Sequence, residues 1–133
     1  MSINKVIVEQ VSPFDVPTTV EKLIAAATKK EWQNPAVHNL QQSLAKSGKE
    51  VRPVQVIEIC KPEFSGKMLE RNDERIISIL MPCRISVYEK ADGKIYVATV
   101  NVKSFTEGQS ENIQKVMLAA ADELEEIVRS VAR

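Results

Sequence analysis

The C-terminal segment carries the pattern that most restricts how this chain can fold. From Ile113 to Val131, apolar residues recur at helical spacing and form one continuous stripe along a predicted helix. Charged residues, among them Glu123, Glu126 and Arg129, fall on the opposite side of that helix. A long helix with a single apolar stripe has to be covered by another layer of structure, and the rest of the chain must supply that layer.

Short segments rich in Val and Ile indicate that the covering layer is a β-sheet. The predicted strands are residues 5–11, 53–60, 76–81, 84–90 and 94–102, with 31–37 as an extended connection or short strand. The Asp92–Gly93 turn joins two of these strands into a hairpin. Further helices are predicted over 18–30, 38–47 and 63–71. The first of them begins at Thr18, with Glu21 completing a capping box.

The order of these elements predicts the fold class. Strands and helices alternate early, and strands then follow one another before the long final helix. This order is typical of an α+β fold, with a mostly antiparallel sheet and helices packed on one face. A chain of 133 residues has the usual size of one domain, so we expect residues 1–133 to form a single domain.

A single layer of helices leaves the second face of the sheet without cover. Alternation along residues 53–60 places Ile57 and Ile59 on the same face. We assign these two residues and Val100 to the uncovered face. Exposed apolar residues of this kind favour burial against a second copy of the chain, so we predict a homodimer.

Composition excludes some partners. The chain has 18 basic and 18 acidic residues, whereas general binding to nucleic acid needs a basic face. It has no apolar run of 18 residues, and its first residues lack the apolar core of a secretory leader. We therefore expect a cytoplasmic protein that binds neither nucleic acid nor membrane, with reduced cysteines.

Three scarce side chains are the candidates for a metal site. The chain has one histidine, His38, and two cysteines, Cys60 and Cys83, and each lies near a proline. Two thiolates and one imidazole are suitable ligands for zinc, and thiolates also suit softer ions such as copper(I). Two alternatives stay open for the cysteines, because buried cysteines commonly pack as small apolar residues or line the wall of a pocket.

Pro82 raises a separate question, because it interrupts an apolar run predicted to be strand. A proline removes a hydrogen-bond donor from the ladder, so it marks a strand edge or a bulge. We expect a bulge here that re-aims the side chain of Cys83. Lys61 and Arg84 each follow a cysteine directly, and they are the candidate residues for binding an anionic small ligand.

Enzyme motifs are absent from the sequence. It contains no glycine-rich phosphate loop, no Gly-x-Ser-x-Gly, no His-Glu-x-x-His and no Cys-x-x-Cys. A thiol enzyme with Cys83 as nucleophile would have only Lys61 and Arg84 nearby to lower the pKa of its thiol. The pattern favours a protein that binds a ligand or metal over an enzyme.

Several segments resemble a known family. Cys60–Lys61–Pro62, the run from Met81 to Ile85 and the Asp92–Gly93–Lys94 turn are similar to the bacterial and archaeal family called domain of unknown function 302. The resemblance extends from about Val16 through the last helix. It implies a compact α+β domain with a TATA-binding-protein-like arrangement, often a homodimer. It implies no catalytic residues, because none is agreed for the family.

The sequence is therefore consistent with two functions. The first is a small-ligand or metal-binding protein with a site at His38, Cys60 and Cys83 that holds zinc or another soft metal. The second is a homodimeric interaction module in which both cysteines are structural.

Overall fold

The computed structural model describes residues 2–3 and 6–133, and it describes side chains from residue 6 onward. Its centre is a six-stranded sheet with the order β1-β2-β6-β5-β4-β3, in which every pairing is antiparallel. The strands are β1 (Ser2–Ile3), β2 (Ile7–Ser12), β3 (Gln33–Asn39), β4 (Val54–Cys60), β5 (Cys83–Glu89) and β6 (Ile95–Val100). The predicted α+β class with a mostly antiparallel sheet is confirmed.

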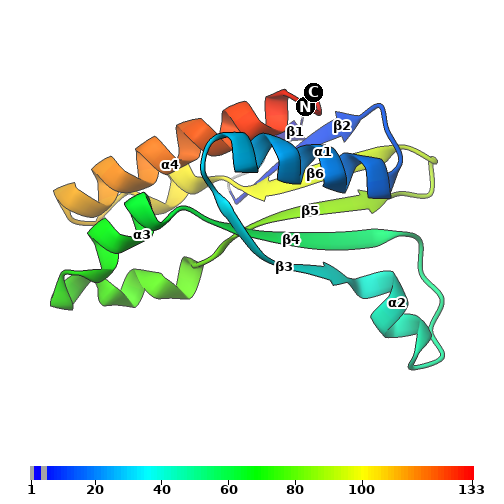
Figure 1. The fold of residues 1–133 in the computed structure, drawn as a ribbon, viewed down its shortest axis with the longest axis horizontal. Helices are drawn as coiled ribbons and strands as arrows, with labels where there is room; N and C mark the ends of the chain where they lie inside the picture. The colour runs from blue at the N-terminus through cyan, green and yellow to red at the C-terminus, as the bar shows by residue number, and fades with distance from the viewer. Residues whose placement is uncertain (1, 4–5) are drawn as a thin grey trace.

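Two long helices, α1 (Val16–Lys29) and α4 (Glu111–Arg129), pack on the same face of this sheet (Figure 1). The helix α3 (Pro62–Leu69) and the 3₁₀ segment η1 (Asn72–Leu80) lie together at one end. The short α2 (Leu40–Ala45) follows β3 at the other end, and the 3₁₀ turn η2 (Val102–Phe105) leads from β6 towards α4. None of the helices in the described part of the chain is long and apolar enough to cross a membrane.

The apolar stripe of α4 is buried as predicted. Its buried residues include Ile113, Val116, Leu124 and Ile127, which belong to the core between this helix, α1 and the sheet. The helix begins where the Ser110 Oγ accepts a hydrogen bond from the Ile113 backbone N–H at 3.2 Å. This cap satisfies one of the N–H groups that the first turn leaves without a partner.

A buried carboxylate ties the start of α4 to η1. Glu74 is 8% exposed; it accepts a hydrogen bond from the Ser110 hydroxyl and another from Asn112 Nδ2 at 2.7 Å. These hydrogen bonds hold the pKa of Glu74 below its ordinary value, because they stabilise the ionised form. The contact therefore fixes the position of η1 against α4 at neutral pH.

The predicted start of α1 was wrong by a few residues. The helix begins at Val16, and the Asp15 carboxylate caps it by accepting from the Thr18 backbone N–H at 2.8 Å. Pro17 occupies the first turn, where a missing N–H costs no helical hydrogen bond. Asp15 is the cap because its side chain reaches this free N–H.

The strand predicted over residues 76–81 was also wrong. Residues 76–80 belong to η1, where Ile77 is buried while Ile76 and Ile79 are 79% and 84% exposed. Pro82 follows η1 after a cis peptide bond from Met81, and β5 begins only at Cys83. Pro82 therefore separates two elements, and Cys83 pairs regularly with Ile59 instead of following a bulge.

The two faces of the sheet carry different residues from those predicted. Ile57 and Ile59 are fully buried on the face that α1 and α4 cover, so the homodimer prediction loses two of its three apolar residues. Only Val100, which is 41% exposed, belongs to the open face. The alternation in β4 was assigned correctly, but periodicity cannot tell which side the helices cover.

Part of the open face is occupied by a polar and aromatic cluster from β2, β5 and β6. The rings of Tyr88 and Tyr96 stack with their centroids 6.0 Å apart. The Tyr88 hydroxyl and the Lys90 ammonium both donate hydrogen bonds to Glu9. The Tyr96 hydroxyl donates to Asp92 at 2.5 Å. This region of the sheet is therefore covered by its own side chains.

Candidate functional site

The structure does not bring the three predicted metal ligands together. His38 lies on β3 opposite Val56, and its Nε2 contacts the Glu58 carboxylate. Cys60 lies four positions further along β4 than Val56, which corresponds to about 13 Å of strand. Among the described residues, no group of three His, Cys, Asp or Glu side chains could hold a metal ion.

The two cysteines lie on neighbouring strands but not as a facing pair. Cys83 is opposite Ile59, whereas Cys60 is the next residue along, with its Sγ 3.6 Å from the Ser65 hydroxyl of α3. Burial raises the pKa of Cys83 to about 11, and nearby Cys60 adds to the shift. A thiol with a raised pKa stays protonated at neutral pH, which argues against Cys83 as a nucleophile.

The two predicted anion-binding residues have different surroundings. Lys61 is held by the Glu123 carboxylate at 2.8 Å and the Glu63 carboxylate at 3.8 Å. The hydrogen bond to Glu123 is the main reason that the pKa of Lys61 is raised. Lys61 therefore serves the fold, because its ion pairs join α3 to α4. Arg84 is exposed, and the described residues offer it no ion pair within 4.0 Å.

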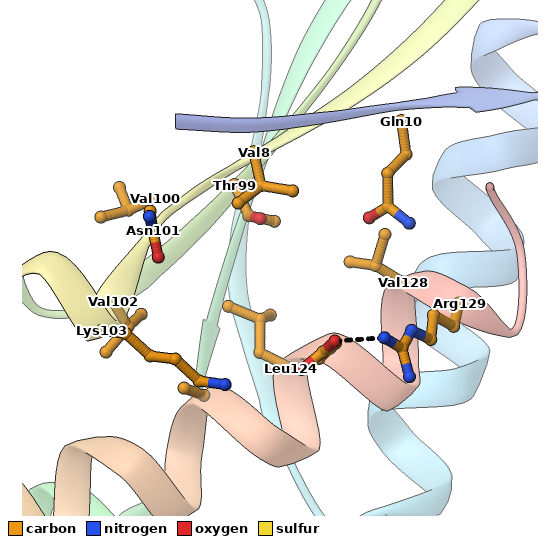
Figure 2. Close-up of a pocket in the computed structure, with 12 residues that line it drawn as sticks. Val8, Gln10, Thr99, Val100, Asn101, Val102, Lys103, Leu124, Val128 and Arg129 are labelled. Carbon is orange, nitrogen blue, oxygen red and sulfur yellow. Dashed lines mark ion pairs between the residues drawn. The ribbon is translucent and has the colours of Figure 1, made fainter. Parts of the chain in front are cut away.

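A different candidate site lies between β2, β6 and the C-terminal half of α4. Here a cavity of about 240 Å³ opens between sheet and helix (Figure 2). Its walls are mostly apolar and come from all three elements and from η2. The apolar lining residues are Val8, Val100, Val102, Ala121, Leu124 and Val128.

A largely buried amide points into this cavity. Gln10 is 7% exposed, and its carboxamide extends from β2 towards Val128 of α4 (Figure 2). No hydrogen bond to this carboxamide is formed by any residue in the part of the chain that the structure describes. Among the described side chains, no nitrogen or oxygen is both shielded from solvent and without a hydrogen-bond partner, so the carboxamide atoms of Gln10 stay accessible from the cavity. A polar group or water in the cavity can therefore complete their hydrogen bonds.

Charged and hydroxyl groups surround the same cavity. Lys103 extends from η2 at one end, and Arg129 lies at the other, joined to Glu125 by an ion pair at 2.5 Å (Figure 2). Lys103 has no carboxylate within 4.0 Å among the described side chains. Thr99 on β6 adds a hydroxyl. The amide of Asn101 lines the cavity as well. The cavity thus combines apolar walls with two amides, one hydroxyl, the Glu125–Arg129 ion pair and one cation that is not neutralised.

The residues of this cavity were not among the predicted site residues. The sequence carried one sign of this site. Gln10 continues the alternation of Val6 and Val8, so an amide occupies one position on an otherwise apolar face of the strand. Lys103 and Thr99 carried no comparable signal. They share a cavity with Gln10 only because β2 pairs with β6 and η2 turns the chain back towards α4.

Comparison with known proteins now connects this structure to a family. The model of the family described as "Domain of unknown function DUF302" matches residues 8–131. The match extends from β2 to the end of α4, so it includes both walls of the cavity. The resemblance predicted from the segments around Cys60 and Cys83 is confirmed.

One known sequence and one solved structure are similar to this chain. An uncharacterized protein of Aquifex aeolicus (strain VF5) is 31% identical over 80 residues, which are 57% of this chain and 54% of that protein. The chain thus aligns with about half the length of this relative. A crystal structure of an uncharacterized conserved DUF302 protein from Bacillus stearothermophilus has a TM-score of 0.82 and 15% identity. That match covers 94% of this chain and 97% of the other, and it shows that the fold is shared.

Proposed function

We propose that this chain, which belongs to the family described as "Domain of unknown function DUF302", binds a small amphipathic carboxylic acid between β2, β6 and α4. The observation that carries the proposal is the Gln10 carboxamide, which points into the cavity without a partner among the described residues. It replaces the predicted site at His38, Cys60 and Cys83, whose side chains the structure does not assemble.

The cavity chemistry defines the ligand class. The apolar walls favour a hydrocarbon skeleton, and 240 Å³ corresponds to the liquid volume of about eight water molecules. The amide N–H groups of Gln10 can donate to a carboxylate, and Lys103 supplies the positive charge that this anion needs. Arg129 is already neutralised by Glu125, so Lys103 is the cation assigned to the ligand.

Binding of hexanoate tests this proposal directly. We expect isothermal titration calorimetry to detect one hexanoate per chain, with weaker binding of hexan-1-ol, which has the same chain without the charge. Lys103→Met should weaken hexanoate binding about tenfold, because a hydrogen bond to a charged group contributes about 1.5–3 kcal/mol. Gln10→Met should also weaken binding, while the free energy of unfolding stays unchanged or rises by up to about 1 kcal/mol.

Lys115→Met is the matched control for charge. Lys115 is exposed on α4 and does not line the cavity, so hexanoate affinity should stay at the wild-type value. Equal hexanoate affinity in the wild type and in Lys103→Met would contradict the proposal. A clear loss of stability in Gln10→Met would show that the amide serves the fold.

A homodimer is a second proposal, and it rests on a different part of the open face. Ile7 and Val100 are paired across β2 and β6 and are 43% and 41% exposed. Apolar side chains gathered at one sheet position favour contact with a second copy. A cytoplasmic location remains a proposal from the sequence.

Sedimentation velocity at micromolar concentration tests the homodimer. We expect the wild type to sediment as a dimer and Val100→Glu to sediment as a monomer, because the substitution places a charge in the apolar contact. Leu118→Glu is the control, since Leu118 is 39% exposed on α4 and away from the open face. A monomeric wild type would contradict the proposal.

A further inference from the structure

Several sulfur-containing residues line one cavity of this structure. The chain has four methionines and two cysteines. The three methionines beyond Met1 (Met68, Met81 and Met117) and Cys83 all line one cavity of about 180 Å³. They come from four parts of the fold, namely α3, the link after η1, α4 and β5.

The remaining walls of this sulfur-lined cavity offer few competing groups. They consist mainly of apolar side chains, among them Ile77, Leu80 and Phe105. Among the described lining residues there is no carboxylate and no imidazole, and Arg84 is the one charged residue. The donor atoms in the cavity are therefore chiefly three thioethers and one thiol.

We propose that this cavity binds one monovalent soft metal ion, copper(I), through Cys83 and the thioethers of Met68, Met81 and Met117. Thiolate and thioether sulfur are the soft ligands that select copper(I) among biological metals. Methionine side chains have three rotatable bonds, so the thioethers can turn towards an ion without movement of the backbone.

The net charge of the metal complex favours copper(I) over zinc at this site. The Cys83 thiol loses its proton to solvent when a Cu–S bond forms, and the resulting thiolate offsets one positive charge. The thioethers are neutral, so the copper(I) complex carries no net charge inside apolar walls. A zinc ion with the same ligands would keep one positive charge, and burying an unpaired charge is costly.

The end of the cavity formed by η1 is the exposed one. Ile79 lines the cavity and is 84% exposed, while Leu80 beside it is 38% exposed. Met81 is only partly buried, in contrast to Met68 and Met117 at 7% and 6%. The Met81 thioether is therefore the first sulfur that an incoming ion would meet.

Competition with a chromophoric copper(I) chelator tests the site. Under anaerobic, reducing conditions we expect the full chain to remove one copper(I) per molecule from bicinchoninate, and X-ray absorption to show sulfur ligands only. Cys83→Ser, Met81→Leu and Met117→Leu should each weaken copper(I) binding about tenfold or more. Methionine and leucine have similar volumes, so these two variants should stay folded.

Cys60→Ser is the matched control. Cys60 is the other thiol of the chain, and it contacts Ser65 instead of lining the cavity. Its replacement should leave copper(I) affinity unchanged, and zinc should not compete at equal concentration. The proposal would be overturned if no copper(I) leaves the chelator, if Cys60→Ser weakens binding as much as Cys83→Ser, or if zinc binds equally well.

Discussion

Replacing Trp32 by alanine is expected to lower the free energy of unfolding by about 3–5 kcal/mol. Trp32 is 4% exposed and packs edge to face on Phe64, with ring centroids 6.0 Å apart. Its indole Nε1 donates a hydrogen bond to Glu123 Oε1 at 3.1 Å. The substitution would therefore open a large cavity between α1, α3 and α4 and leave Glu123 with one partner fewer. Urea denaturation followed by circular dichroism measures the loss.

The Trp32→Phe variant distinguishes the stability that comes from packing from the stability that comes from the indole hydrogen bond. It keeps most of the buried aromatic surface and removes the indole N–H, so the expected loss is about 1–2 kcal/mol. Glu123 would still accept from Lys61 at 2.8 Å. A loss below about 1 kcal/mol for Trp32→Ala would mean that the neighbouring helices collapse onto the vacated space.

Ile127→Ala is expected to cost about 2–5 kcal/mol. Ile127 is fully buried in the apolar stripe of α4, where it contributes to the core between helix and sheet. Loss of its side chain removes apolar contact and leaves a cavity that the packed core cannot fully close. The same urea titration measures this change.

Leu118→Ala on the same helix is the control. Leu118 is 39% exposed, and alanine has the higher helix propensity, so we expect a change within about 0.5 kcal/mol. If the two variants lost equal stability, the burial of the α4 stripe would not be what stabilises the fold. Neither residue lines the cavity of Gln10 or the sulfur-lined cavity, so ligand and copper(I) binding should persist in the folded variants.

Sequence patterns alone determined the fold class and its longest elements. The stripe from Ile113 to Val131 identified α4, and the Asp92–Gly93 turn identified the β5–β6 hairpin. Both are local signals: helical spacing and turn chemistry depend on residues close together in the chain. The resemblance at Cys60–Lys61–Pro62 and around Cys83 likewise identified the family.

Short apolar runs could not tell a strand from a helix, nor which face of a strand is covered. Residues 76–81 contain enough Ile and Leu for a strand, yet residues 76–80 form part of η1 because Ile77 packs inward and Glu74 ties the segment to α4. Alternation in β4 separated Ile57 from Glu58 but could not say which of them faces the helices. That choice depends on where α1 and α4 pack, which periodicity does not encode.

The candidate sites were decided by tertiary structure. Proximity to proline suggested a link among His38, Cys60 and Cys83, but the register of β3, β4 and β5 keeps them from forming one ligand group. Gln10 and Lys103 are 93 positions apart and line the same cavity only through the β2–β6 pairing and the turn of η2. Local sequence patterns were enough to identify the longest helices and strands and the family of the chain. Only the packed chain decided which side chains share a cavity, because such contacts depend on strand order and helix placement, which no local pattern specifies.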